Sequence, residues 1–187
     1  MSEGEAHRPL VTDCNLQVTG VLLVGGASER FGAPKALALF RGEMLADRGR
    51  RLLEEACDEV LVVGKAADGL PFPVIDDGAC SRAPVYGLIA GLRAARHDVV
   101  VALPVDVPLV TAGVLRELGA AGAVPSERIP LPGAYPRSLL PELERRVASR
   151  RLSLRGVNHT LLEVPDELLL DADTPEELAA LASAGVD

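Results

Sequence analysis

Short apolar segments alternate with segments of helical periodicity from residue 18 to the end of the chain, and this alternation constrains the fold more than any other feature. Apolar runs that fit buried strands occupy residues 18–24, 60–63, 74–75 and 99–103, with shorter candidates at 123–124 and 160–164. Strands that alternate with helices favour a mostly parallel sheet with helices on both faces. We therefore predict a three-layer, Rossmann-like α/β fold whose crossovers are right-handed.

The expected helices lie between these strands and carry recognisable start signals. Helices are expected over residues 43–57 and from Pro84, Thr111, Ser138 and Thr174. Pro84 suits the first position of a helix, because the N–H group that proline lacks would have no partner there. Thr111 can accept a backbone hydrogen bond as a helix cap. Thr174 and Glu177 have the spacing of a reciprocal capping box.

The length of 187 residues suits one domain with a substantial core. Residues 1–17 are polar and acidic and are predicted to form a loose tail, and residues 18–187 are predicted to form a single domain. Hydrophobic residues make up 48% of the sequence, but tryptophan is absent. The core is therefore expected to consist of leucine, valine, alanine and isoleucine.

The net charge of −8 argues against broad binding to nucleic acid or to anionic membranes, both of which need a basic face. A net negative charge still permits the binding of a small anionic ligand by a few local cations. The cysteines are odd in number and lack metal-ligand spacing, so we interpret Cys14, Cys57 and Cys80 as reduced thiols, with Cys57 in the core. No signal segment and no membrane-spanning run is found, which predicts a cytoplasmic protein.

Three polar features follow predicted strands at their carboxyl ends. A loop with Gly25 and Gly26 follows the first strand, Asp77 follows the third, and Asp106 follows the strand at 99–103. Ligands of open α/β sheets bind outside the carboxyl ends of the strands. The sequence therefore predicts that these features meet at one edge of the sheet and form the binding site.

The glycine loop also carries Arg30 and Lys35, and Lys35 is one of two lysines in a chain with seventeen arginines. Backbone N–H groups of such a loop can bind phosphate oxygens, and the two cations would neutralise their charge. The loop matches neither the P-loop nor the dinucleotide fingerprint, which disfavours a dehydrogenase or flavodoxin-like domain. It is either a different phosphate-binding loop or a strand-to-helix turn with incidental surface cations.

Each of three aspartates admits two interpretations. Asp106 lies between Pro104 and Pro108 and is well placed for Mg²⁺, which takes one or two carboxylates together with phosphate oxygens. The alternative is a turn residue bonded to its own backbone. Asp77 either faces a base or a metal or only shapes a turn. Asp173 either supports the N-terminal dipole of the last helix or binds a ligand as well.

Five blocks of the sequence together resemble the MobA-like nucleotidyltransferases. The segment LLVGGASERFGAPKALALF resembles the family signature L-A-G-G-x-S-x-R-M-G-x-D-K, and RAPVYGLIAGLRAA is similar to G-P-x-x-G-L-x-A-x-L. LPVDVPLV is similar to P-C-D-x-P, IPLPGAYPRSLLPELE to P-L-x-A-x-Y-R-R-x-L, and DADTPEEL to N-x-N-T-P-E-D-L. The blocks follow the family's order between residues 18 and 180, and the set is specific although each block alone is weak.

The resemblance is strongest to guanylyltransferases that transfer GMP from GTP to molybdopterin and release pyrophosphate. It implies Mg²⁺ as the cofactor and a molybdoenzyme or chaperone as protein partner, without nucleic acid or membrane. Arg30, Lys35 and Asp106 would form the catalytic set. The resemblance also implies that the guanine contacts Leu23, Val24 and Gly25 and that the phosphates bind to Gly26, Arg30 and Lys35. It implies a position in the nucleotide pocket for Asp77. It further implies a metal site at Asp106 and Asp173, with Asp173 near the second substrate.

The same resemblance leaves the choice between GTP and CTP open. The pair Gly25 and Gly26 resembles the guanylyl enzymes, since cytidylyl relatives tend to have alanine before the glycine. Asp171 and Asp173 stand where the family pattern has asparagines, which favours the cytidylyl side, and Pro34 replaces the usual acid. The alternatives are therefore a CTP-dependent molybdopterin cytidylyltransferase, another MobA-like nucleotidyltransferase, and a catalytically impaired paralogue that binds nucleotide.

Overall fold

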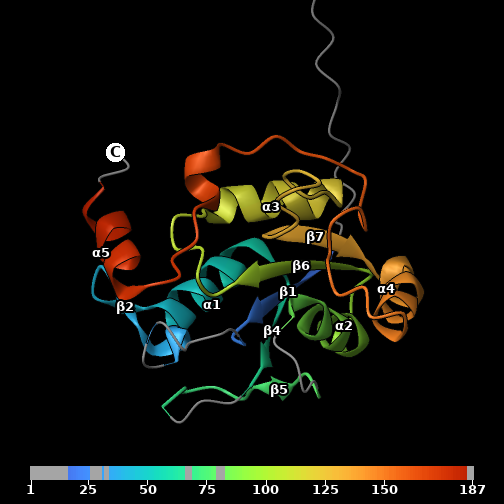
Figure 1. Ribbon diagram of the computed structural model, residues 1–187, viewed down its shortest axis with the longest axis horizontal. Helices are drawn as coiled ribbons and strands as arrows, with labels where there is room; N and C mark the ends of the chain where they lie inside the picture. Colours follow the sequence, from blue (N-terminus) through green and yellow to red (C-terminus); the bar gives the residue numbers. More distant parts are fainter. Residues whose placement is uncertain (1–16, 26–30, 32–33, 66–68, 79–82, 185–187) are drawn as a thin grey trace, which may run out of the picture.

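A five-stranded sheet lies at the centre of the fold, with its strands in the order β5-β4-β1-β6-β7 (Figure 1). The computed structural model describes residues 17–25, 31, 34–65, 69–78 and 83–184, so nearly all of the predicted tail lies outside the described residues. The strands of this sheet are β1 (Val18–Leu23), β4 (Glu59–Gly64), β5 (Ile75–Asp76), β6 (Val99–Pro104) and β7 (Gly133–Pro136). A separate hairpin pairs β2 (Leu39–Phe40) with β3 (Glu43–Met44).

Parallel pairing joins β5, β4, β1 and β6, which confirms the predicted parallel strands, while β7 runs antiparallel to β6. Strand β7 is not apparent in the sequence, because glycine and proline make up half of its four residues and both are depleted in strands. The strands predicted at 123–124 and 160–164 are wrong as sheet members. They meet each other only in a parallel bridge between Val124 and Leu161, because β7 occupies the edge of β6.

Helices cover both faces of the sheet, which confirms the three-layer arrangement (Figure 1). One face carries α1 (Leu45–Ala56) and α3 (Ala112–Ala121), and the other carries α2 (Pro84–Ala94) and α4 (Leu140–Ala148). The remaining elements are α5 (Pro175–Ser183), which packs beside β2, and the 3-10 helices η1 (Lys35–Leu37), η2 (Arg137–Leu139) and η3 (Asp166–Leu169). The helix predicted from Ser138 thus begins as η2 and becomes α-helical at Leu140.

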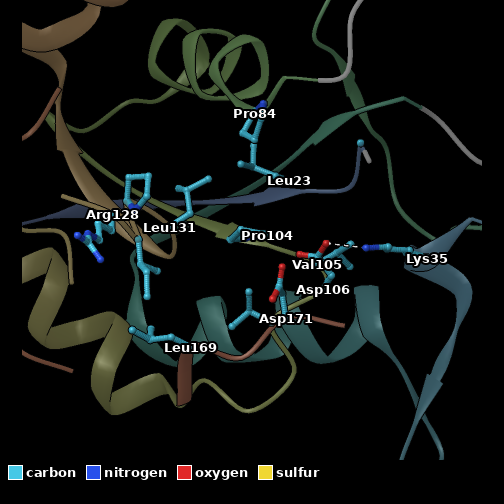
Figure 2. A pocket seen from close by; sticks show the side chains of 14 residues that line it. Leu23, Lys35, Pro84, Pro104, Val105, Asp106, Arg128, Leu131, Leu169 and Asp171 are labelled. Carbon is cyan, nitrogen blue, oxygen red and sulfur yellow. Dashed lines mark hydrogen bonds and ion pairs between the residues drawn. The ribbon is translucent and has the colours of Figure 1, made fainter. Parts of the chain in front are cut away.

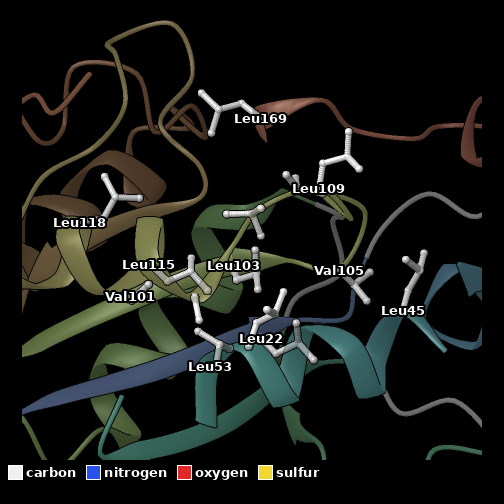
Figure 3. Packing of buried hydrophobic residues seen from close by; sticks show 14 of the residues in the cluster. Leu22, Leu45, Leu53, Val101, Leu103, Val105, Leu109, Leu115, Leu118 and Leu169 are labelled. Atoms are coloured by element: carbon white, nitrogen blue, oxygen red, sulfur yellow. The ribbon is translucent and has the colours of Figure 1, made fainter. Parts of the chain in front are cut away.

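The core has two parts because successive residues of a strand point to opposite faces of the sheet. Leu22 of β1 belongs to the cluster between the sheet and α1 and α3, where it is buried with Leu53 and Leu115 (Figure 3). Val21, one residue earlier, belongs to the cluster under α2, with Leu88. A strand that is covered on both sides is apolar throughout, which explains why β1 and β6 are continuous apolar runs in the sequence.

The predicted helix start signals are confirmed. Pro84 is the first residue of α2. The Thr111 hydroxyl oxygen accepts a hydrogen bond from the Val114 N–H at the start of α3. At α5, Thr174 and Glu177 each accept a hydrogen bond from the other's backbone N–H, which is the predicted capping box.

Cys57 follows α1 and packs half-buried against the cluster under α1 and α3. Burial, together with the nearby Asp58 carboxylate, raises the pKa of the Cys57 thiol to about 12, against a smaller lowering by Arg116. The thiol is therefore uncharged at neutral pH, as expected of an unreactive core cysteine. Cys14 and Cys80 lie outside the described residues.

Asn158 is a buried polar side chain that joins three segments. Its amide nitrogen donates to the carbonyl oxygens of Gly122 and Ala134, each at 2.7 Å. Its side-chain oxygen accepts from the Thr160 N–H at 2.9 Å. These bonds connect the end of α3, strand β7 and the segment that bridges to Val124, so one side chain anchors the β7 edge of the sheet.

We predict that Asn158→Ala lowers the free energy of unfolding by roughly 2–4 kcal/mol, because it leaves buried backbone groups without partners. Thr160→Ala is the matched control, since the exposed Thr160 side chain makes no hydrogen bond to a described residue, and it should cost less than about 0.5 kcal/mol. Urea titration followed by circular dichroism measures both. An Asn158→Ala variant as stable as the control would contradict the anchoring role.

Candidate active site

A cavity of about 440 Å³ opens at the carboxyl ends of β1 and β6, at the edge of the sheet that the sequence predicts (Figure 2). It is lined by the strand ends, η1, the start of α2, the loop before β7 and the segment before α5. The lining includes the predicted site residues Leu23, Gly25, Lys35 and Asp106. Two of the three polar features that follow different strands, Gly25 and Asp106, thus line one cavity, and Asp77 lies beside Gly25 without lining it.

The Lys35 ammonium lies between two carboxylates. Its Nζ is 3.0 Å from Asp106 Oδ2 and 2.7 Å from Asp173 Oδ1. Lys35 begins η1 and is only 5% exposed, while Asp106 follows β6 and Asp173 precedes α5. Figure 2 shows the pair of Lys35 and Asp106 at one end of the cavity. The predicted phosphate-binding cation and both predicted metal ligands are therefore in direct contact.

Burial lowers the pKa of Lys35, but hydrogen bonds and charge from Asp173 and Asp106 together outweigh burial, so the pKa is raised above its ordinary value. Lys35 therefore carries a full positive charge over the neutral pH range. A charged group that the protein already holds in position can stabilise developing negative charge without reorganising.

Backbone hydrogen bonds fix the two aspartates relative to each other. The Ala172 N–H donates to the Asp106 carbonyl oxygen at 2.9 Å. The Glu177 carboxylate accepts from the Asp173 N–H at 2.7 Å, in addition to its capping bond. The capping box therefore both begins α5 and orients the segment that carries Asp173. Asp171, to which the sequence analysis assigns no role, lines the same cavity.

Asp77 lies next to the glycine loop, as predicted. A Cβ atom built on Gly25 would come within 4.0 Å of Asp77 Oδ2. The Asp77 carboxylate is 2.9 Å from Lys65 Nζ, and Lys65 also pairs with Asp76 at 2.7 Å. Both lysines of the chain therefore bind aspartates at this edge of the sheet. No motif in the sequence marks Lys65, although the scarcity of lysine applies to it equally.

The ends of β1 and β4 approach too closely for any side chain at Gly64. Gly64 has φ +144°, and a Cβ atom there would lie 2.6 Å from the Gly25 backbone nitrogen. The Val24 N–H donates to the Val63 carbonyl oxygen at 2.9 Å and holds the two chains together. The sequence shows Gly64 only as the end of a strand, so its part in positioning the glycine loop is not apparent there.

The other predicted residues differ in their placement. Val24 is not among the residues that line the cavity, and its side chain packs half-buried against the cluster under α1 and α3. Gly26 and Arg30 lie outside the described residues. Arg128, in the loop before β7, lines the cavity although no motif in the sequence marks it.

The carboxylates fit a metal ion that is bound jointly with a substrate. Within the described part of the chain, no group of three His, Cys, Asp or Glu side chains is arranged to hold a metal ion alone. Asp106 and Asp173 nevertheless direct one oxygen each at a single cation, the Lys35 ammonium. Mg²⁺ is usually bound by one or two carboxylates and completed by water and phosphate oxygens, so this donor set suits it.

Residues 20–183 match the family model of the MobA-like NTP transferase domain. The chain belongs to this family. The match confirms the resemblance that the sequence motifs indicate, and it covers the whole sheet from the third residue of β1 onward. The domain is a nucleotidyltransferase by family.

Relatives of this MobA-like NTP transferase domain have closely similar names. A protein from Aquifex aeolicus named "Probable molybdenum cofactor guanylyltransferase" is 30% identical over 176 residues, which is 86% of this chain and 88% of the relative. A "Molybdenum cofactor guanylyltransferase" from Burkholderia ambifaria is 40% identical over 114 residues. That match spans about half of each chain, 56% in both cases.

A solved structure shows the same fold. The molybdopterin-guanine dinucleotide biosynthesis protein A from Archaeoglobus fulgidus has a TM-score of 0.71 to this MobA-like NTP transferase domain, at 20% identity. The likeness covers 88% of this chain and 96% of that chain. Among the described helices of the domain, none is long and apolar enough to cross a membrane.

We predict that Lys35 and Asp173 are energetically coupled beyond an ordinary surface pair. A double-mutant cycle with Lys35→Met and Asp173→Asn should give a coupling energy of about 1–3 kcal/mol in urea unfolding, because the ammonium is buried. The exposed pair Arg50 and Glu54, 2.6 Å apart, is the control, and its cycle should give about 0.3–0.5 kcal/mol. Equal coupling energies in the two cycles would contradict a structural role for the Lys35 pair.

Proposed function

We propose that this chain is a molybdenum cofactor guanylyltransferase, which transfers GMP from GTP to molybdopterin and releases pyrophosphate. Both relatives described above bear that activity in their names, and one of them aligns over 88% of its length. The observation that carries the proposal is the buried cation Lys35 paired with Asp106 at the cavity. A fixed cation beside a carboxylate that can hold Mg²⁺ suits the transfer of a nucleotidyl group between phosphates.

The reaction depends on position and charge rather than on proton transfer. The nucleophile is a terminal phosphate oxygen of molybdopterin, which is an anion at neutral pH and needs no protein base. It forms a bond to the α-phosphorus of GTP while the opposite bond, to the bridging oxygen, breaks. The electron pair of that bond leaves with pyrophosphate. The protein must therefore hold two anionic substrates in line and offset their repulsion.

Lys35 would stabilise the triphosphate and the leaving pyrophosphate. An ammonium group has three donors, so phosphate oxygens can replace or join the carboxylate oxygens now at 3.0 and 2.7 Å. The backbone at the start of η1 is held by a hydrogen bond from the Leu37 N–H to the Pro34 carbonyl oxygen, which fixes the origin of the Lys35 side chain. Gly26 and Arg30 belong to the same proposed phosphate site.

We propose Mg²⁺ as the cofactor, held by Asp106 and Asp173 together with phosphate oxygens. When bound, it would add positive charge against the phosphates as the negative charge develops. The side chains of Asp106 and Asp173 are 25% and 53% exposed, so both can be reached by a ligand. The hydrogen bond from Ala172 to Asp106 keeps the two carboxylates close whichever cation they bind.

The guanine would lie along Leu23, Gly25 and the backbone of Val24, whose side chain packs against the core, with Asp77 beside it. Guanine presents an N1–H and a 2-amino group on one edge, and a carboxylate can accept hydrogen bonds from both, whereas cytosine offers one amino group. The closeness of Asp77 to Gly25 therefore supports GTP over CTP. We further propose the cytoplasm as the compartment and a molybdoenzyme or its chaperone as the protein that receives the product.

Calorimetric titration with GTP, CTP and ATP in Mg²⁺ tests the proposal. We expect GTP to bind at least about tenfold more tightly than CTP, and Asp106→Ala to weaken GTP binding by about tenfold or more, since charge-assisted contacts are lost. Glu117→Ala, an exposed acid on α3, is the control and should leave GTP binding unchanged. Preference for CTP would change the product to the cytosine dinucleotide. Absence of nucleotide binding would contradict the proposal in favour of an impaired paralogue.

We also predict that Lys35→Ala lowers kcat for GMP transfer by about 10²–10³, because a fixed charge on the reacting phosphates is lost. The variant should still fold, because the sheet and helices do not depend on the cavity. Its circular dichroism spectrum should therefore match that of the wild type. Arg155→Ala, which removes an exposed cation outside the cavity, should keep the turnover of the wild type. Near wild-type turnover in Lys35→Ala would show that Lys35 does not serve the reaction.

A further inference from the structure

Arg128 lies at the end of the cavity opposite to Lys35 (Figure 2). It is exposed, and no hydrogen bond or ion pair joins its guanidinium to any residue that the structure describes. Many other arginines are held by carboxylates, among them those in the pairs Arg50–Glu54, Arg93–Glu144 and Arg96–Glu59. Arg128 is therefore a cation that lines the cavity without a partner in the described protein.

The loop that carries Arg128 is fixed on both sides of it. The Ser126 hydroxyl oxygen accepts a hydrogen bond from the Ile129 N–H at 3.0 Å. The hydroxyl of Tyr135, a fully buried residue of β7, donates to the Pro130 carbonyl oxygen at 2.7 Å. These anchors hold the backbone of Arg128 at the rim of the cavity, so its side chain needs no rearrangement of the loop to reach a ligand there.

The charge of the cavity favours a second cation at the end away from Lys35. Asp106, Asp171 and Lys35 all line it, and the charge of Lys35 is already balanced by Asp106 and Asp173. Both substrates of the proposed reaction are anions, and the triphosphate would occupy Lys35. The acceptor then needs a positive group elsewhere, and Arg128 is the only other cationic side chain among the described residues that line this cavity.

The lining between the two cations is apolar. Leu131 and Leu169 lie on the Arg128 side of the cavity, and Pro104 lies between them and the Lys35 end (Figure 2). Asp77, beside which the guanine would lie, is not part of this lining. An apolar surface that ends in an arginine suits a flat ring system carrying an anionic group, since a guanidinium both binds anions and stacks on rings.

We infer that Arg128 binds the acceptor, through an anionic group separated by the ring system from the phosphate that attacks GTP. This inference rests on the proposed function, because it assigns the Arg128 end of the cavity to molybdopterin and the Gly25 end to the nucleotide. Arg128 is thus a specificity-determining residue for the acceptor. It touches neither the α-phosphate nor the leaving pyrophosphate, so its loss should raise KM for the acceptor and leave kcat nearly unchanged.

The test compares the wild type with Arg128→Gln, Arg128→Lys and Arg155→Gln. Steady-state GMP transfer gives KM and kcat for molybdopterin, and calorimetry gives the GTP affinity of each variant. We expect Arg128→Gln to raise KM for molybdopterin by about tenfold or more, with kcat and GTP affinity within about twofold of the wild type. Arg128→Lys should recover part of the loss. Arg155→Gln, which removes another exposed cation that lies outside the cavity, should change nothing.

Two results would overturn the inference. One is a KM for molybdopterin in Arg128→Gln that matches the Arg155→Gln control. The other is a joint loss of GTP affinity and kcat in Arg128→Gln, which would assign Arg128 to the nucleotide. If the wild type binds no GTP, the proposed function fails, and equilibrium dialysis with molybdopterin alone still decides the inference. Binding by the wild type that Arg128→Gln weakens would support it, and equal or absent binding would overturn it.

Discussion

The positive charge of Lys35 lets two carboxylates, Asp106 and Asp173, lie close together at the edge of the sheet. Asp106 and Asp173 would repel each other across a partly buried space, and the ammonium between them, at 3.0 and 2.7 Å, removes that repulsion. The three residues come from η1, the end of β6 and the segment before α5, which the sheet brings to a common edge. The strand order brings the three segments to the same edge of the sheet, and the ion pairs determine which of their side chains face each other there.

The parts of the fold that depend on local sequence could be predicted, and the parts that depend on distant pairing could not. The strands β1 and β6 are recognisable because burial on both faces requires apolar residues throughout, and the caps at Thr111 and Thr174 are complete within four residues. Strand β7 escapes prediction because only its pairing with β6 makes it a strand. Likewise, the meeting of Lys35 with Asp106 follows from the topology rule, whereas no pattern in the sequence marks Arg128 as a cavity residue.

The proposed substrates are anions, although the chain carries a net charge of −8. Asp171, which lines the cavity, and Asp173, which pairs with Lys35, stand where the family pattern has asparagines and bring extra negative charge to the edge of the sheet. Cations that bind together with the anionic substrate would offset its repulsion by these acids. Mg²⁺ and a nucleoside triphosphate usually bind jointly in this way. Electrostatic attraction would then come from the metal–substrate complex as a whole rather than from the net charge of the chain, which is negative.

The pair between Lys35 and Asp173 spans 138 residues of sequence, so its members leave the ribosome at very different times. Strands β1, β4 and β6 are all synthesised before the segment of Asp173, and their hydrophobic faces can already be covered by α1, α2 and α3. A growing or prematurely terminated chain can therefore contain a folded sheet without the residues that complete the cavity. The C-terminal segment would therefore be the last part of the site to assemble. Proteolytic loss of α5 and the loop before it would abolish the proposed activity in a molecule whose sheet is still folded.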